Sequence, residues 1–145
     1  MRILGIDYGA KRVGVAVSDE MEWTARALKT IDRMSRRAVA EEIVRMAGEL
    51  SVEEIVIGYP LRLDGSMGIQ CLKVDRFIEI LSSMTHLPIK RWDETLSTKE
   101  AEERMREQGL SPRKRREWVD RMAASIILQS YLDYVEMKKI RGEHD

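Results

Sequence analysis

The sequence has very few of the residues that form covalent cross-links or nitrogen- and sulfur-ligated metal sites. Its 145 residues include one cysteine, Cys71, and two histidines, His86 and His144. A lone cysteine excludes an intramolecular disulfide and a cysteine-based zinc site. The histidines are far apart in the chain, which argues against a histidine-based triad or a histidine-rich metal centre. Any metal ion is therefore expected to have oxygen ligands, which favours Mg²⁺ or Mn²⁺.

Long apolar runs and an excess charge of one sign are also absent. No run approaches the ~18 residues of a membrane span, and no signal peptide precedes the first strand-like segment. A cytoplasmic protein is therefore expected. Lys and Arg number 25, as do Asp and Glu, so the formal net charge is zero. There is no global field that attracts nucleic acid, although a local basic patch can still do so.

The apolar periodicities predict a single α/β domain over residues 1–138, followed by a charged tail over 139–145. Strands are expected at residues 2–8, 12–18, 22–31, 54–58 and 88–94, and helices at 35–50, 69–84, 97–108 and 118–137. Ser97 and Glu100 form a capping box at the start of the third helix, and the polar, basic residues 111–117 are expected to connect the last two helices. Strands that alternate with helices imply parallel crossovers, whereas the opening hairpin adds antiparallel neighbours. The expected result is a mixed sheet with helices on both faces.

Acidic residues occur at the ends of three core elements. Asp7 ends the first strand, Asp93 and Glu94 end the strand that begins at residue 88, and Asp120 lies in the first turn of the last helix. Each has an ordinary alternative role, in a turn for Asp7 and at a helix N-terminus for the others. Together, however, three converging carboxylates can hold one or two divalent cations. Two such ions about 3.5–4 Å apart serve phosphodiester cleavage by activating water and stabilising the leaving oxygen.

Basic residues lie close in sequence to two of these acids. Lys11 and Arg12 follow Asp7, and the densest basic run leads into the helix that carries Asp120; this run consists of Arg113, Lys114, Arg115 and Arg116. Such runs are usually solvated surface, but a positive rim beside carboxylates is what a phosphate backbone requires. These six residues are the candidates for nucleic-acid binding. Trp118 is expected either to anchor its helix or to stack on a base.

The residues above carry a family resemblance. The chain resembles the YqgF/RuvX family of small RNase H-like nucleases, whose members are described as Holliday-junction resolvases or as pre-16S rRNA nucleases. The matching stretches are GIDYG with KRVGVAVSD at residues 5–9 and 11–19, GYP at 58–60, DG at 64–65, DETLST at 93–98 and VDRMAA at 119–124. The resemblance implies an RNase H-like fold with a mixed five-stranded sheet. It also implies that Asp7, Glu94 and Asp120 form the catalytic metal site, with Asp93 as a further possible ligand. Thr95 stands where many relatives have arginine, a departure that concerns phosphate binding and leaves the acids unchanged.

The expected function is that of a divalent-metal-dependent endonuclease acting on structured nucleic acid. The resemblance favours processing of the 5′ end of precursor 16S rRNA over resolution of Holliday junctions in DNA. Two readings of other classes stay open. One is a relative of actin-like ATPases and sugar kinases, because the turn after Asp7 resembles their first phosphate-binding motif. The other is a non-catalytic rRNA-binding assembly factor. The chain is expected to act as a monomer or a homodimer.

Overall fold

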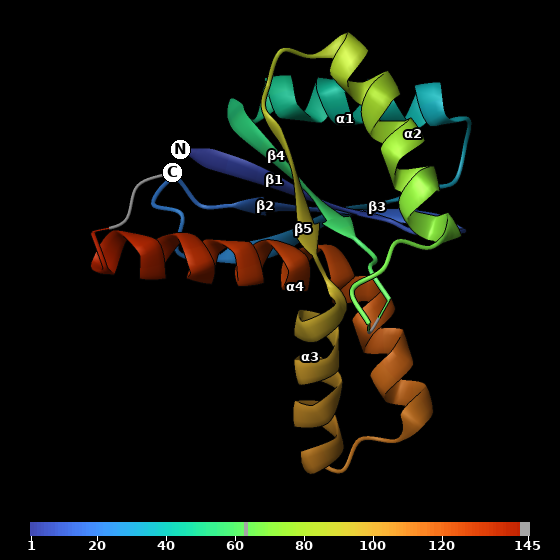
Figure 1. The fold of residues 1–145 in the computed structure, drawn as a ribbon, viewed down its shortest axis with the longest axis vertical. Helices are drawn as coiled ribbons and strands as arrows, with labels where there is room; N and C mark the ends of the chain where they lie inside the picture. The colour runs from blue at the N-terminus through green and yellow to red at the C-terminus, as the bar shows by residue number, and fades with distance from the viewer. Residues whose placement is uncertain (63, 143–145) are drawn as a thin grey trace.

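Five strands form one mixed sheet at the centre of the protein (Figure 1). A computed structural model describes residues 1–62 and 64–142, without the side chains of residues 95–98; His144 and the side chain of the predicted cap Ser97 lie outside this description. The strands are β1 (Arg2–Tyr8), β2 (Arg12–Ser18), β3 (Ala25–Asp32), β4 (Val52–Tyr59) and β5 (Ile89–Asp93). Their order across the sheet is β3-β2-β1-β4-β5. The β1–β2 and β2–β3 pairs are antiparallel, and the β1–β4 and β4–β5 pairs are parallel, as predicted.

Alternation along β1 assigns its side chains to two different cores. Leu4, Ile6 and Tyr8 belong to the larger apolar cluster on one face of the sheet, whereas Ile3 belongs to the smaller cluster on the other. Because successive strand residues point to opposite faces, Asp7 shares the face of Ile3. Asp7 therefore lies on the face of the sheet that carries the smaller apolar cluster.

Helices cover both faces of the sheet (Figure 1). Helices α1 (Arg36–Glu49) and α2 (Ile69–Met84) contribute the apolar residues of the larger core. The second half of α4 (Pro112–Ile140) packs on the opposite face through Ala124, Ile127, Leu128 and neighbouring residues. Local signals agree with these elements: the Ser35 hydroxyl accepts the N–H of Ala38 at the start of α1, at 3.1 Å.

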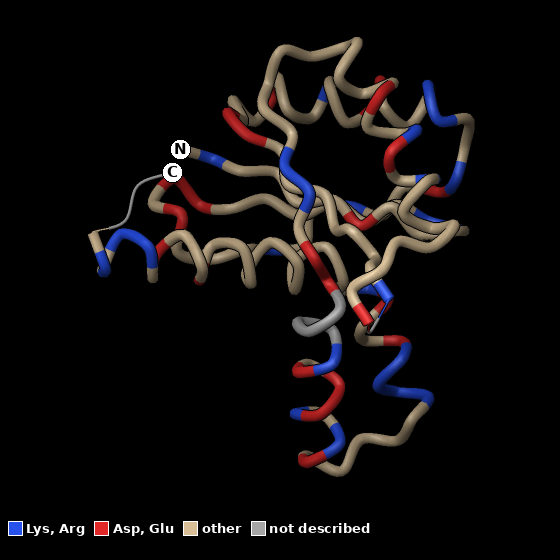
Figure 2. The backbone as a smooth tube through the Cα atoms, in the orientation of Figure 1, with Lys and Arg blue, Asp and Glu red and all other residues tan. Residues whose placement is uncertain are grey.

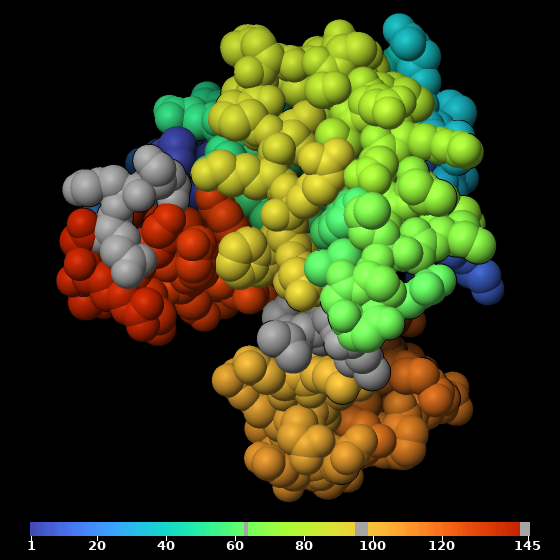
Figure 3. All heavy atoms as spheres, viewed as in Figure 1, coloured from blue at the N-terminus to red at the C-terminus, as the bar shows by residue number. Residues whose placement is uncertain are grey.

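Helix α3 (Thr95–Glu107) and the first part of α4 form a helical hairpin that protrudes from the sheet (Figures 1 and 3). In Figure 1, α4 changes direction where it reaches the sheet. The Ser125 hydroxyl of α4 donates to the Met122 carbonyl oxygen at 2.7 Å, a bond of the kind that often bends helices. The hairpin thus projects beyond the carboxyl ends of the parallel strands.

The predicted connection at residues 111–117 is wrong beyond its first residue. Ser111 caps α4 by accepting the N–H of Lys114, and Pro112 occupies the first helical position. Both are helix-start signals, and lysine and arginine are good helix formers. The absence of an apolar stripe concealed the helix, because this part of α4 protrudes from the sheet. Helix α3 likewise begins two residues earlier than predicted, and α4 ends three residues later, at Ile140.

In the described part of the chain, no helix combines the length and the apolar character needed to cross a membrane.

Candidate functional site

The elements that carry the three predicted acids meet at one edge of the sheet. Asp7 lies near the carboxyl end of β1, and Glu94 directly follows β5. Both strands run parallel to β4, so their carboxyl ends share an edge, where sites collect in parallel α/β sheets. Asp120 lies on α4, whose Ala124 side chain contacts the same face of the sheet as Asp7. The fold therefore brings together acids separated by more than a hundred residues.

The structure distinguishes the two adjacent acids at the end of β5. Asp93 is exposed, whereas Glu94 is partly buried. The Glu94 carboxylate lies against Gly58 on β4, where an added Cβ atom would come within 2.9 Å of Oε2. The Glu94 N–H donates to the carbonyl oxygen of Tyr59, at 3.5 Å. Glu94 is thus the acid that is held over the sheet edge.

Burial and mutual repulsion couple these acids electrostatically. Burial and then the charge of Asp120 together raise the pKa of Asp7 to about 6. Burial also raises the pKa of Glu94 to about 7, with contributions from Asp7 and then Asp93. Asp7 is therefore the link between Asp120 and Glu94. Groups with strongly shifted pKa values, gathered at a sheet edge, are typical of functional sites.

The donor chemistry of this site fits a hard divalent cation, although the carboxylates are not gathered into a metal-binding cluster. Within residues 1–62 and 64–142, no three acidic, histidine or cysteine side chains lie in an arrangement that could hold a metal ion. The available donors are carboxylate oxygens, which Mg²⁺ and Mn²⁺ prefer. Burial and the charges of neighbouring carboxylates raise the pKa values of Asp7 and Glu94, and a bound cation would favour the ionised forms of both.

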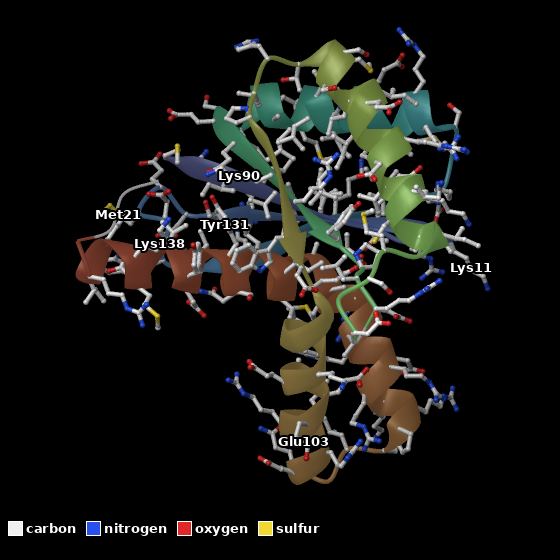
Figure 4. The ribbon with its side chains drawn as sticks, in the orientation of Figure 1. Lys11, Met21, Lys90, Glu103, Tyr131 and Lys138 are labelled. Atoms are coloured by element: carbon white, nitrogen blue, oxygen red, sulfur yellow. The ribbon has the colours of Figure 1, made fainter. Side chains whose placement is uncertain are left out.

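A groove of about 870 Å³ opens beside Asp7 and Asp120. Its lining also includes Lys11 from the β1–β2 turn, Arg12 from the start of β2 and Arg121 from α4. Lys11 projects from the fold into solvent (Figure 4), and Arg12 lies 3.9 Å from Asp32 in an exposed ion pair. Arg121 is not among the six predicted nucleic-acid-binding residues; its place next to Asp120 in the sequence was the available signal.

The basic run at residues 113–116 lies on the protruding part of α4, outside the lining of this groove (Figure 2). Arg113 and Arg116 precede Asp120 by seven and four residues, so all three share one helix face. Arg113 forms an ion pair with Glu117 at 3.2 Å. Arg115 is partly buried, and its guanidinium donates to the Leu110 carbonyl oxygen at 2.7 Å. This contact gives Arg115 a structural role in the α3–α4 turn.

Trp118 lines a different hollow from Asp120. This second cleft, of about 550 Å³, lies between α3 and α4, and it is lined by Trp118, Met105, Leu110 and Ile126 together with polar residues. Trp118 and Asp120 are two residues apart, which places them on different sides of the helix. The partly buried indole therefore fits the predicted anchoring role between the two helices.

Comparison with known proteins agrees with this architecture. A family model described as RuvX, Holliday junction resolvase, matches residues 1–134. A protein of Syntrophus aciditrophicus (strain SB) with the name "Putative pre-16S rRNA nuclease" is 57% identical over 143 residues, covering 99% of this chain and 95% of the relative. A protein of the same name from Halothermothrix orenii is 44% identical over 142 residues, covering 98% of this chain and all of the relative.

Solved structures with low sequence identity share the fold. T. thermophilus RuvC in complex with a Holliday junction substrate is similar with a TM-score of 0.51 and 14% identity, over 70% of this chain and 69% of that protein. The fowlpox virus Holliday junction resolvase also has a TM-score of 0.51, with 13% identity over 92% of this chain and 99% of that protein. The prediction of a mixed five-stranded RNase H-like sheet is thereby confirmed.

Proposed function

This chain belongs to the RuvX family, and we propose from that membership that it is a nuclease that hydrolyses phosphodiester bonds in structured nucleic acid. One observation carries the proposal: Asp7, Glu94 and Asp120 meet at one sheet edge, where the charge of Asp120 raises the pKa of Asp7 and the charge of Asp7 raises the pKa of Glu94. Two of them are partly or largely withdrawn from water, and the groove beside them is lined by Lys11, Arg12 and Arg121.

Within this proposal, Asp7, Glu94 and Asp120 hold Mg²⁺ or Mn²⁺. A bound divalent cation supplies positive charge that stabilises charge developing on the phosphate and lowers the pKa of a water molecule. The three carboxylates would direct their oxygens toward the cation from β1, from the residue after β5 and from α4. The packing of these elements in and against the sheet fixes their positions. Protons and the cation compete for these carboxylates, since without metal the pKa of Glu94 is about 7 and that of Asp7 is about 6. Asp93 is exposed and takes part only as a nearby charge.

The basic residues position the nucleic acid by its backbone. Lys11, Arg12 and Arg121 line the groove next to the acids. Arg113, Lys114 and Arg116 extend positive charge along the protruding part of α4, about 6–10 Å along the helix axis from Asp120 at 1.5 Å per residue. Arg115 contributes mainly by holding the α3–α4 turn. Contacts of these side chains with phosphates fix register and orientation without reading sequence.

The favoured substrate is precursor 16S rRNA, because relatives 57% and 44% identical to this chain have the name "Putative pre-16S rRNA nuclease". Our proposal places the cleavage at the 5′ end of this RNA, in the cytoplasm. Cleavage of Holliday junctions is the second candidate, favoured by the description of the matching family model. The two differ in what they need from the protein. Symmetric cleavage of a junction requires two active sites, as in a homodimer, whereas trimming of one strand requires a single site.

The deciding experiment is cleavage of defined substrates by the purified protein. An RNA spanning the 5′ leader and the start of 16S rRNA, and a four-way DNA junction, would each be incubated with Mg²⁺, Mn²⁺ or EDTA. We expect metal-dependent cleavage of the RNA, and loss of cleavage in Asp7→Asn. Glu41→Gln is the matched control, because this exposed acid lies on α1, on the opposite face of the sheet. Undiminished cleavage by Asp7→Asn would remove the proposed site. Binding of the RNA without cleavage under any condition would favour a non-catalytic assembly factor.

A further inference from the structure

Tyr59, the last residue of β4, forms hydrogen bonds through both its backbone and its side chain. Its carbonyl oxygen accepts the N–H groups of Leu61, at 3.0 Å, and of Glu94, at 3.5 Å. Its hydroxyl donates to Asp75 Oδ2 at 2.9 Å and lies 3.3 Å from the sulfur of Met67. Tyr59 therefore joins the β4–α2 loop, helix α2 and the residue that follows β5.

The Asp75 carboxylate continues this connection to β5. Its second oxygen, Oδ1, accepts from Arg91 Nε at 2.9 Å. The Arg91 guanidinium also lies 5.7 Å from the centre of the Tyr59 ring. Arg91 lies on β5, and Glu94 directly follows that strand. The contacts therefore form a closed circuit: Tyr59 to Asp75, Asp75 to Arg91, along the chain to Glu94, and from the Glu94 N–H back to Tyr59.

We infer that Tyr59 and Asp75 are positioning residues for the reaction, which hold Glu94 over the edge of the sheet. The inference rests on the proposed function, since it assigns these residues a task in that site. Glu94 lies just beyond the last paired residue of β5, so the strand ladder by itself does not fix its place. The circuit adds a constraint by joining the end of β4 and the end of β5 to helix α2 through side chains. Neither side chain was identified as functional from the sequence, because the circuit joins three separate segments, β4, α2 and the end of β5.

The protein contains a second circuit of the same chemistry, which offers a matched control. The Tyr131 hydroxyl donates to Glu54 Oε1 at 2.8 Å, and Lys90 Nζ lies 3.1 Å from that hydroxyl and 3.0 Å from Glu54. Figure 4 shows Lys90 of β5 beside Tyr131 of α4. Both circuits therefore join a tyrosine, a carboxylate and a cation on β5. Only the one at Tyr59 returns to Glu94.

The test compares Tyr59→Phe with Tyr131→Phe, each of which removes one hydroxyl from one circuit. For Tyr59→Phe we expect kcat to fall about 10- to 100-fold, as for a small misplacement of a catalytic group, with KM changed less than about twofold. For Tyr131→Phe we expect kcat to stay within about threefold of the wild type. The urea midpoint of Tyr131→Phe should nevertheless fall by about as much as that of Tyr59→Phe. Equal kcat in the two variants, or a change confined to KM in Tyr59→Phe, would overturn the inference.

A second variant keeps the test decisive if Tyr59→Phe folds poorly. Asp75→Ala removes the shared acceptor of Tyr59 and Arg91, so it should lower kcat to a similar extent. In the double variant the effects should not add, because members of one network are coupled. Additive losses would show that Tyr59 and Asp75 act separately and would contradict the circuit.

Two measurements that need no cleavage separate failure of this inference from failure of the proposed function. Mn²⁺ binding, measured by calorimetry, should weaken in Tyr59→Phe and stay unchanged in Tyr131→Phe. Hydrogen exchange at the Glu94 and Leu61 amides should accelerate in Tyr59→Phe only. If the wild type cleaves no substrate but these differences appear, the positioning role of Tyr59 and Asp75 is supported and the proposed reaction is wrong. If cleavage is present and both differences are missing, the circuit falls.

Discussion

The carboxylate of Glu94 occupies space that exists because residue 58 of β4 is glycine. A Cβ atom at Gly58 would lie 2.9 Å from Glu94 Oε2, 3.2 Å from its carboxyl carbon and 2.7 Å from Ile127 Cδ1. Real Cβ contacts are essentially never shorter than 3.0 Å, so any larger residue must displace both side chains. The absence of a side chain on the neighbouring strand thus lets the acid reach the sheet edge.

Gly58→Ala is therefore expected to lower activity strongly. Both clashing groups are the ends of flexible side chains, so they can move aside at a cost of about 1 kcal/mol in the free energy of unfolding. Moving Glu94 by about 1 Å, however, should reduce kcat on the order of 100-fold. Steady-state cleavage assays and urea unfolding of the same preparation measure both effects.

Gly5→Ala serves as the structural counterpart of Gly58→Ala. Its Cβ would lie 2.7 Å from Leu128 Cβ and 3.2 Å from the Ala124 carbonyl oxygen. These atoms belong to the backbone and base of α4, so they cannot yield without moving the helix. We expect a loss of about 1–3 kcal/mol in the free energy of unfolding. A Gly58→Ala protein that is as destabilised as Gly5→Ala, but fully active per folded molecule, would contradict the proposed place of Glu94.

Asp7→Asn is expected to stabilise the protein at alkaline pH while abolishing cleavage. The pKa of Asp7 is raised in the folded protein from 3.8 to about 6 by burial and by the charge of Asp120. Ionisation of Asp7 therefore costs stability: the penalty is full above about pH 7 and vanishes below about pH 4. Replacing the acid with a neutral amide removes a penalty of about 2–3 kcal/mol.

Urea unfolding of wild type and Asp7→Asn at pH 8.0 and pH 4.0, without divalent metal, measures this difference. The variant should be more stable at the higher pH and nearly equal to the wild type at the lower one. A variant that is less stable than the wild type at pH 8.0 would show that a stabilising contact offsets the burial of the ionised Asp7 carboxylate.

Glu94→Gln and Asp93→Asn are expected to differ sharply in activity. Glu94 is partly buried over Gly58, whereas Asp93 is exposed. Loss of the Glu94 charge should reduce kcat by about 100-fold or more, the scale of a lost electrostatic contribution in an active site. Loss of the Asp93 charge should change kcat by less than about threefold, because an exposed charge is screened by solvent and salt. Equal losses in the two variants, measured with saturating Mg²⁺, would place both acids in the site.

Replacing Lys11, Arg12 or Arg121 with alanine is expected to lower the affinity for nucleic acid. It should also make that affinity depend less steeply on salt concentration. Each side chain lines the groove beside Asp7 and Asp120. Removal of one phosphate contact should reduce the slope of log K against log salt by about 0.7–0.9. Fluorescence anisotropy with labelled RNA, from low to physiological salt, measures this slope.

Arg141→Ala is the control for these binding measurements, because Arg141 lies at the far end of α4. Its affinity and slope should match those of the wild type. Arg115→Ala should instead lower the free energy of unfolding, through loss of the bond to Leu110. A slope that does not change in any of the three groove variants would move the binding surface elsewhere.

Local patterns in the sequence determined much of this architecture. The two-residue alternation of β1 and β2 and the 3.6-residue periodicity of α1 and α2 depend on near neighbours, and they agree with the observed elements. The matching motifs predicted the family and the fold, and both predictions are confirmed. The prediction of a connection at residues 111–117 was wrong, because a helix that protrudes from the sheet needs no apolar stripe.

Long-range packing decided what local patterns could not. Adjacent acids such as Asp93 and Glu94 have the same donor chemistry, and the fold distinguishes them by holding Glu94 over Gly58 and leaving Asp93 exposed. Likewise Arg121 reaches the groove through the bend of α4 onto the sheet, and Tyr59 meets Asp75 and Arg91 because β4, α2 and β5 come together at one place. The sequence by itself determined which elements form and which acids they carry, since these depend on short-range periodicity. Tertiary structure decided which of those acids face one another and what holds them there, since these depend on contacts between residues far apart in the chain.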